Sequence, residues 1–362
     1  MVRDSSIQPA LKTVAVDFNP ATREVATGTE VYTRELGSRL PAAGPEFRWL
    51  FYASRPRAGL GVDVMVVPMA RLWSQVRLPL AMQPAHPDLL FVPAHAIPFG
   101  WPGKSLTVIH DLAFERRPEA YSLAERSYLR LTTRWAVLRC HLLIVPSEST
   151  KADLVELYGV AGDRVRVVPH GGGEQVEREV APVGRLAELG LDGSFVLQVG
   201  RIERRKNQAA ALAAVERLDG VTLAVAGPER DHALAVQLRA SSRCRVLGRV
   251  DPPTLELLYQ RARAVVVPSL YEGFGFPVLE AMARGQVVVA ARTSSLPEVG
   301  GDAVLYVDDP NDPGELGQAL ETAIGTRKVR TLLVRAAKAR AAEFTWDRSA
   351  AGVASVVREL LG

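Results

Sequence analysis

Two glutamates, Glu272 and Glu280, bracket a glycine-rich segment that follows an apolar stretch at residues 264–267. Pro277 stands where a helix would begin and Gly285 just past its expected end, the usual placement of these residue types around a helix. The start of such a helix and the turn before it expose backbone amides that bind anions. Carboxylates accept hydrogen bonds from sugar hydroxyls. This segment therefore predicts a ligand that carries both phosphate and sugar, as a sugar nucleotide does.

A basic loop follows a second apolar stretch, residues 195–199. Gly200 ends that stretch, and Arg201 and Lys206 come within the next six residues. Both side chains are long enough to reach a diphosphate at the same edge of a sheet. A solvated loop that starts a helix is the alternative for this segment taken alone. Beside the segment at 272–280, we favour the diphosphate.

Gly28 lies between a predicted strand at residues 13–18 and a predicted helix that starts at residue 29. A glycine in this place lets the backbone approach a ligand closely, although an ordinary loop glycine would look the same. No second and third glycine follow at dinucleotide-binding spacing, so the loop does not indicate an NAD-dependent dehydrogenase.

His110 ends a predicted strand at residues 106–110 and points to the same edge of the sheet. Its imidazole could hydrogen-bond a sugar hydroxyl or the reacting centre, and a structural role is the alternative. His95 occupies a similar strand end, and His170 lies at the expected junction between domains, where it would line the cleft or stabilise the hinge.

Strand and helix patterns alternate along the whole chain, which predicts an α/β protein with two doubly wound, parallel-stranded domains. The expected strands are residues 13–18, 47–53, 62–67, 89–92, 106–110, 142–146 and 165–169, then 195–199, 221–226, 245–247, 264–267, 287–290 and 304–307. The expected helices are residues 29–40, 72–82, 123–140 and 150–158, then 208–218, 232–241, 254–263, 278–284 and 347–361. Ligands bind at the carboxyl ends of such strands, so the site should lie between the domains.

The composition is that of an ordinary soluble globular protein, with 362 residues, 48% hydrophobic and 23% charged. A net charge of +4 gives no reason to expect a nucleic-acid partner. The two cysteines, Cys140 and Cys244, fall in different predicted domains and favour a reducing, cytoplasmic location. No spacing of His, Cys and carboxylates indicates a metal, and no apolar run reaches the roughly 18 residues of a spanning helix.

Two segments could touch an anionic membrane surface, which would place the protein peripherally at the inner face of the membrane. One is residues 71–78, which mix tryptophan, leucine and arginine. The other is the helix predicted at 123–140, with arginines at 126, 130, 134 and 139. A solvated face, or one packed on the core, is the alternative.

Taken together, these motifs resemble the retaining glycosyltransferases of the GT-B type, family 4. The resemblance covers nearly the whole chain, and the seven-residue spacing of Glu272 and Glu280 after Pro268-Ser269 is its most specific part. It implies a first, acceptor-side domain at residues 1–175, a linker at 176–193, a nucleotide-sugar domain at 194–345, and a last helix within 346–362 that crosses back to the first domain.

The resemblance also implies a role for each matching residue. Glu272 would contact the donor sugar and Glu280 the nucleotide ribose, while Arg201 and Lys206 grip the diphosphate. The amides of Gly273, Phe274 and Gly275 would hold sugar and phosphate, Gly28 would approach the ligand, and His110 would lie at the reacting centre. Such enzymes usually need no metal or other cofactor.

The implied activity is transfer of a hexose from a nucleotide-diphosphate sugar to a glycan, lipid-linked or small-molecule hydroxyl. Residues 107–119 look most like those of mannosyltransferases, which points to GDP-mannose, with UDP-sugars as the other donors. The junction departs from the common Asn-Gly-Val-Asp, because this chain reads His-Gly-Gly-Gly at residues 170–173. A sugar-nucleotide epimerase of the same architecture and a non-catalytic binding subunit are the alternatives.

Overall fold

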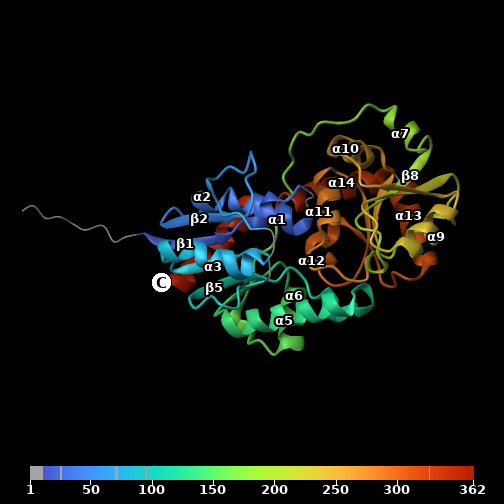
Figure 1. Cartoon of the computed structure of the whole chain (residues 1–362). Helices are drawn as coiled ribbons and strands as arrows, with labels where there is room; N and C mark the ends of the chain where they lie inside the picture. Colours follow the sequence, from blue (N-terminus) through green and yellow to red (C-terminus); the bar gives the residue numbers. More distant parts are fainter. Residues whose placement is uncertain (1–10, 25–26, 70–71, 95, 326) are drawn as a thin grey trace, which may run out of the picture.

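The computed structural model describes residues 11–24, 27–69, 72–94, 96–325 and 327–362. Two parallel sheets lie side by side, one in each half of the chain (Figure 1). The first has the order β3-β2-β1-β4-β5-β6-β7, and the second β10-β9-β8-β11-β12-β13. The prediction of two doubly wound, parallel-stranded α/β units is therefore confirmed.

Strands at the centre of both sheets are buried along their whole length, as expected where helices cover both faces. The first sheet contains β1 (Lys12–Asp17), β2 (Phe47–Ala53), β3 (Val64–Val66), β4 (Leu89–Val92), β5 (Lys104–Val108), β6 (Leu143–Val145) and β7 (Val165–Val167). The second contains β8 (Ser194–Val199), β9 (Val221–Ala226), β10 (Cys244–Gly248), β11 (Ala264–Val267), β12 (Val288–Ala291) and β13 (Leu305–Val307).

The helices connect these strands and pack on the sheets. In the first half they are α1 (Gly28–Gly37), α2 (Leu40–Ala43), α3 (Leu78–Met82) after a π-helical segment at Trp73–Arg77, α4 (Ala113–Arg116), α5 (Leu123–Arg139) and α6 (Glu148–Tyr158). In the second they are α7 (Arg185–Glu188), α8 (Gln208–Val215), α9 (His232–Ala240), α10 (Pro252–Arg261), α11 (Phe276–Ala283), α12 (Leu296–Gly300), α13 (Pro313–Gly325), α14 (Arg327–Ala341) and α15 (Trp346–Leu361).

The last helix, α15, packs against the first sheet rather than the second. Its apolar side chains Trp346, Val353 and Val357 share one core cluster with β1 and α1. Fully burying an aliphatic or aromatic side chain contributes roughly 1.5–3 kcal/mol each. The chain therefore closes with a helix that ties its end to its beginning.

Two segments, residues 171–173 and 341–346, lie side by side where the chain crosses between the halves. Glycines allow their close contact. A Cβ on Gly171 would lie 2.3 Å from the backbone nitrogen of Trp346, and one on Gly173 would lie 1.9 Å from the carbonyl oxygen of Ala341. The amide of Gly173 donates to the carbonyl of Phe344 at 2.9 Å. Gly171, which the common junction motif shares, and Gly173, which departs from it, thus both have a packing reason.

The structure differs from the predicted elements in two places that matter here. Strand β5 ends at Val108, so His110 lies in the loop after the strand rather than at its last position. Helices α13 and α14 were not predicted. In α13 the signal was present, since Leu316, Leu320 and Ala323 are buried at helical spacing. In α14 numerous arginines and lysines dilute the apolar pattern.

Candidate active site

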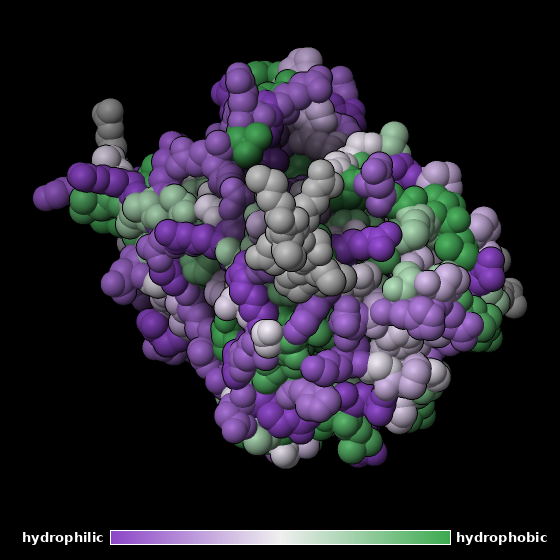
Figure 2. All heavy atoms as spheres, turned by 90° about the vertical axis from the view of Figure 1, so that its left-hand side faces the viewer, coloured by the Kyte–Doolittle hydropathy of each residue, from purple (hydrophilic) through white to green (hydrophobic). Residues whose placement is uncertain are grey.

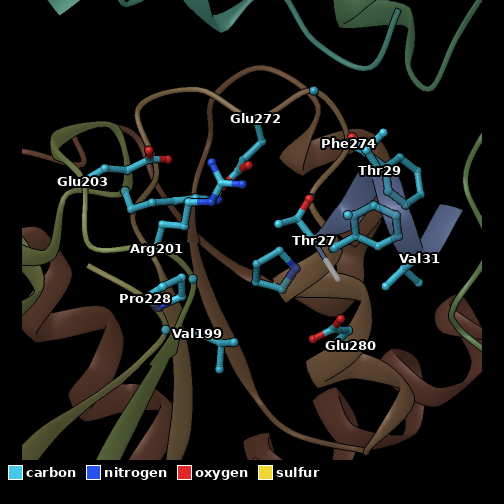
Figure 3. A pocket seen from close by; sticks show the side chains of 18 of the residues that line it. Thr27, Thr29, Val31, Val199, Arg201, Glu203, Pro228, Glu272, Phe274 and Glu280 are labelled. Atoms are coloured by element: carbon cyan, nitrogen blue, oxygen red, sulfur yellow. The ribbon is translucent and has the colours of Figure 1, made fainter. Parts of the chain in front are cut away.

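A pocket of about 550 Å³ lies between the two halves, at the carboxyl ends of their strands. Nine residues singled out from the sequence line it: Gly28, His110, Arg201, Lys206, Glu272, Gly273, Phe274, Gly275 and Glu280. Figure 3 shows Glu272 and Glu280 at opposite ends of the pocket, with Thr27, just before α1, and Thr29 of α1 on one wall and Arg201 on the facing one. Segments far apart in sequence are therefore brought to one site.

Glu272 sits at the centre of a buried charge cluster. Its carboxylate is 2.5 Å from Nζ of Lys206 and 3.2 Å from a guanidinium nitrogen of Arg205, which also pairs with Glu203 at 2.7 Å. Burial alone would raise the pKa of Glu272, but Lys206 and Arg205 outweigh it and lower that pKa to about 2. The carboxylate is therefore ionised at every physiological pH.

The pKa of Lys206 depends on the same buried neighbours, although its side chain carries the opposite charge. Its burial lowers the pKa of the ammonium, Glu272 opposes that shift, and the neighbouring Arg205 adds to it. Lys206 and Arg205 share the Glu272 carboxylate, and Glu203 balances the second positive charge, so these four side chains together carry no net charge. An ammonium has three N–H donors, so Lys206 can donate to a bound anion as well as to Glu272.

Arg201 differs from these cations because it is not committed to a protein carboxylate. Within the residues that the structure describes, its guanidinium has no ion-pair partner within 4.0 Å. Its side chain is half-buried and lines the pocket after β8. Arg201 can therefore engage an anionic ligand without first breaking a protein ion pair.

Two helices begin at the pocket, and their first residues lie next to each other. A Cβ on Gly28, the first residue of α1, would be 3.2 Å from the ring of Phe276, the first residue of α11. For the amides of Gly273, Phe274 and Gly275, no acceptor is found in the described part of the chain. Helix starts and unpaired amides both favour a bound anion.

Glu280 lies one turn into α11 and is oriented by a neighbouring helix. The hydroxyl of Tyr259 on α10 donates to Oε2 of Glu280 at 3.0 Å. The guanidinium of Arg284 lies over the Tyr259 ring at 4.4 Å and bonds the carbonyl of Glu280. Among the described residues, the other carboxylate oxygen of Glu280 has no hydrogen-bond partner, so it is available to a ligand hydroxyl.

His110 is engaged by the protein through both ring nitrogens. Its Nε2 is 2.7 Å from the carbonyl of Pro93, which can only accept, so Nε2 carries the proton. Its Nδ1 is 3.2 Å from Nε2 of His170, which must then be the donor. Burial lowers the pKa of His110. Burial, and to a smaller extent the neighbouring His110, lowers the pKa of His170 well below its usual value. Both rings are therefore neutral at pH 7.

Two family models match the chain. The model described as "Glycosyltransferase Family 4" matches residues 26–171, and the one described as "Glycosyl transferases group 1" matches residues 187–340. The chain belongs to the group 1 glycosyltransferases. The prediction of a transferase with the GT-B fold is thereby confirmed.

Relatives and solved structures agree with this family. O-antigen chain mannosyltransferase B of Escherichia coli is 30% identical over 258 residues, covering 67% of this chain and 67% of that protein. D-inositol 3-phosphate glycosyltransferase of Acidothermus cellulolyticus is 34% identical over 244 residues, covering 60% and 53%. The chain thus spans about half to two thirds of these relatives.

Among solved structures, sucrose-phosphate synthase from Thermosynechococcus elongatus superimposes with a TM-score of 0.75 at 21% identity, covering 97% of this chain and 99% of that one. Anabaena HepE, in complex with UDP and glucose, superimposes with a TM-score of 0.74 at 19% identity, covering 96% and 100%. At these identities the likeness shows the shared GT-B fold.

Sequence reasoning missed several residues that line this glycosyltransferase's pocket or orient its side chains. Arg205 stands between two other cations, and only the short 3-10 turn at Arg204–Lys206 decides that it faces Glu272 while Arg204 faces solvent. Tyr259 showed no signal, because its contact with Glu280 joins two helices. His170 was weighed but not chosen, and the structure places it against His110.

His95 and Arg71 lie outside the described residues. In the part of the chain that is described, no three His, Cys, Asp or Glu side chains gather closely enough to hold a metal ion. None of the helices described there is both long enough and apolar enough to cross a bilayer.

Proposed function

We propose that this glycosyltransferase moves a hexose from a nucleotide-diphosphate sugar to a hydroxyl acceptor, with retention at the anomeric carbon. The observation that carries this proposal is the buried cluster of Lys206, Arg205 and Glu272 beside two adjoining helix starts. Cations and amides suit a diphosphate, and a permanently ionised carboxylate suits sugar hydroxyls. Both groups occur together in a sugar nucleotide.

The pocket suggests how the donor would lie. Glu280 would accept from the ribose, and Leu255, one helical turn before the Tyr259 that orients Glu280, would border the base with Val250. The diphosphate would then meet Arg201 and the amides before α11. At the other end, the hexose would reach Glu272 and His110. The 550 Å³ volume is within the range of pockets for ligands of this kind.

In the proposed reaction, the bond between C1 and the phosphate oxygen breaks, and its electron pair stays on the diphosphate. The acceptor oxygen forms the new bond to C1 from the same face and passes its proton to a phosphate oxygen. Lys206, Arg201 and the α11 start are fixed where the negative charge develops, which lowers the barrier because they need no reorganisation. The neutral histidines add no charge that would oppose the oxocarbenium-like sugar.

Mannose is the hexose that we favour. The 30% identical Escherichia coli relative is named a mannosyltransferase, and residues 107–119 carry the mannosyltransferase-like pattern. The Acidothermus cellulolyticus relative is named a D-inositol 3-phosphate glycosyltransferase, and HepE was crystallised with UDP and glucose. GDP-mannose and UDP-sugars are accordingly the donors to compare first. We propose that neither metal nor other cofactor takes part.

For the acceptor, we propose a glycan or lipid-linked hydroxyl reached at an anionic membrane surface on the inner side of the membrane. Some of the residues that suggested this contact are engaged elsewhere: Trp73 is buried and donates to the Val67 carbonyl, and Arg126 and Arg130 both pair with Glu115. The side chains that do face solvent on these segments include Leu72, Val76 and Arg77 on the first, and Leu123, Glu125, Tyr128, Leu131, Arg134 and Leu138 on the second. On the end of the molecule in Figure 2, hydrophobic residues lie in several separate patches among hydrophilic ones. Apolar and cationic side chains together suit anionic headgroups.

A donor screen tests the proposal. UDP-, GDP- and ADP-sugars are compared by thermal shift, because a ligand that binds the native state raises the melting temperature. The donor that stabilises is then incubated with candidate acceptors, and NMR reads the product and its anomeric configuration. Transfer with retention supports the proposal. A changed sugar without transfer would identify an epimerase, and binding without any turnover would identify a binding subunit.

A further inference from the structure

The loop that carries Glu272 is held from both halves of the molecule. On its own side, the carbonyls of Glu272 and Phe274 share the single hydroxyl hydrogen of Ser295, whose Oγ lies 2.9 Å and 2.8 Å from them. Ser294 Oγ accepts from the Glu272 amide. On the opposite side, helix α6 provides two hydroxyls. Ser147 Oγ, at the start of α6, donates to the Gly273 carbonyl at 2.7 Å.

Thr150 completes this contact from the first turn of α6. Its Oγ1 donates to the same Gly273 carbonyl at 3.1 Å, and its amide donates to Ser147 Oγ at 3.1 Å. Ser147 and Thr150 are 2% and 0% exposed. Gly273 is also buried, and an unsatisfied carbonyl in a buried place is costly.

One turn further along α6, Asp153 holds the residue just before Glu272. The hydroxyl of Tyr271 donates to Oδ2 of Asp153 at 2.7 Å and accepts from the amide of Leu112 at 3.3 Å. Arg116 occupies the other oxygen of Asp153 at 2.8 Å. The loop is therefore fixed by groups from the first half of the chain at Tyr271 and Gly273, the residues on either side of Glu272.

The glycine at 273 is required by the same contact. A Cβ there would lie 2.0 Å from the carbonyl oxygen of His110 and 2.6 Å from Cβ of Asp111. Its φ lies outside the left-handed region, so backbone strain does not explain the glycine. What demands it is the close approach of the two halves.

We propose that Ser147, Thr150 and Asp153 of α6 are positioning residues for transfer, which hold the Glu272 loop in its working shape only while the two halves are together. This rests on the function proposed above. The first half would thus contribute to the reaction through its grip on the donor loop, in addition to binding the acceptor. Hydrolysis of the donor in an open molecule would be slow, because the carboxylate, the amides and the cations would not be aligned.

The test compares Ser147→Ala/Thr150→Val with the wild-type protein. Release of UDP or GDP from the sugar nucleotide that the wild type accepts is measured at saturation, and binding of free UDP and GDP is measured by calorimetry. Two buried hydrogen bonds support an expected fall in kcat of roughly 5–100-fold. Affinity for the free nucleotide should stay within about twofold, because Arg201 and Glu280 are untouched.

Two further variants separate positioning from packing. The single variant Thr150→Ser keeps the hydroxyl and should retain most of the wild-type turnover. Thr132→Val removes an equally buried hydroxyl that bonds only carbonyls of its own helix, and should leave turnover unchanged. Turnover of the double variant above half the wild-type value, or an equal loss in Thr150→Ser, would overturn the proposal.

A distance measurement keeps the test independent of activity. Spin labels are placed at exposed Ser127 and Gln237, one in each half; the native cysteines Cys140 and Cys244 are buried and would not compete. With UDP or GDP bound, the wild type should give one short distance and the double variant an added longer one. An unchanged distribution would count against the proposal. If the wild type released nucleotide from no donor, the proposed function would fail while this measurement still decided the role of α6.

Discussion

Replacement of Lys206 by methionine tests the charge chemistry most directly. Methionine keeps an unbranched apolar side chain in a site where Lys206 is only 9% exposed, but it removes the ammonium beside Glu272. Loss of one preorganised group that stabilises developing charge typically lowers kcat by about 10²–10³. At 1.36 kcal/mol per factor of ten, that is about 3–4 kcal/mol of barrier.

Lys206→Met should also lower the folding stability, but only by a limited amount. Breaking a buried ion pair by removal of one partner usually costs about 3–5 kcal/mol. Glu272 still retains Arg205 at 3.2 Å, so we expect a loss below that range and a folded protein. The measurement is nucleotide release at saturating donor, with a thermal melt to confirm folding and calorimetry to compare nucleotide affinity.

Arg204→Met is the matched control for this variant. Arg204 lies in the same turn, two positions before Lys206. Its side chain is 72% exposed and pairs with Asp231 outside the pocket. It should retain wild-type turnover. The reasoning is refuted if folded Lys206→Met keeps more than a third of the wild-type kcat, or if Arg204→Met loses as much.

Three further predictions follow from the same geometry. Arg201→Gln should raise KM for the donor roughly tenfold or more with a smaller change in kcat, because an uncommitted cation binds the diphosphate already in the ground state; steady-state kinetics would contradict this if only kcat fell. Turnover should stay within about twofold in excess EDTA, whereas a complete loss that magnesium restores would reveal a metal requirement. The pKa of Glu272 is about 2 in the folded protein against an ordinary 4.5, so its ion pairs stabilise the fold above pH 4.5 and stop doing so as the pH falls toward 2. The melting-temperature gap between wild type and Glu272→Gln should therefore shrink between pH 6 and pH 3, and a constant gap would contradict the assignment.

Sequence patterns predicted the parts of this molecule that depend on local chemistry. Alternating strands and helices, the α11 start at Phe276-Pro277 and the basic turn after β8 all arise from neighbouring residues. The contacts that complete the site could not be predicted in this way. Gly273 meets Ser147 across 126 positions, and Tyr259 meets Glu280 between two helices. The first contact depends on how the two halves dock and the second on how α10 and α11 pack within the second half, and one sequence carries no pattern for either.

The charge cluster also explains why an acid stands among the cations of the proposed diphosphate site. Without Glu272, Arg205 and Lys206 would lie buried side by side with Glu203 alone to offset two positive charges, and the desolvation of both would be poorly compensated. With Glu272 present, the cations are held in place before the donor arrives. A diphosphate that approaches Arg201 and Lys206 then weakens the hold of Lys206 on Glu272, and leaves that carboxylate freer to accept from sugar hydroxyls. On this view, binding of the phosphates and binding of the sugar are coupled through one ion pair, so Glu272→Gln should impair recognition of the hexose more than recognition of the free nucleotide.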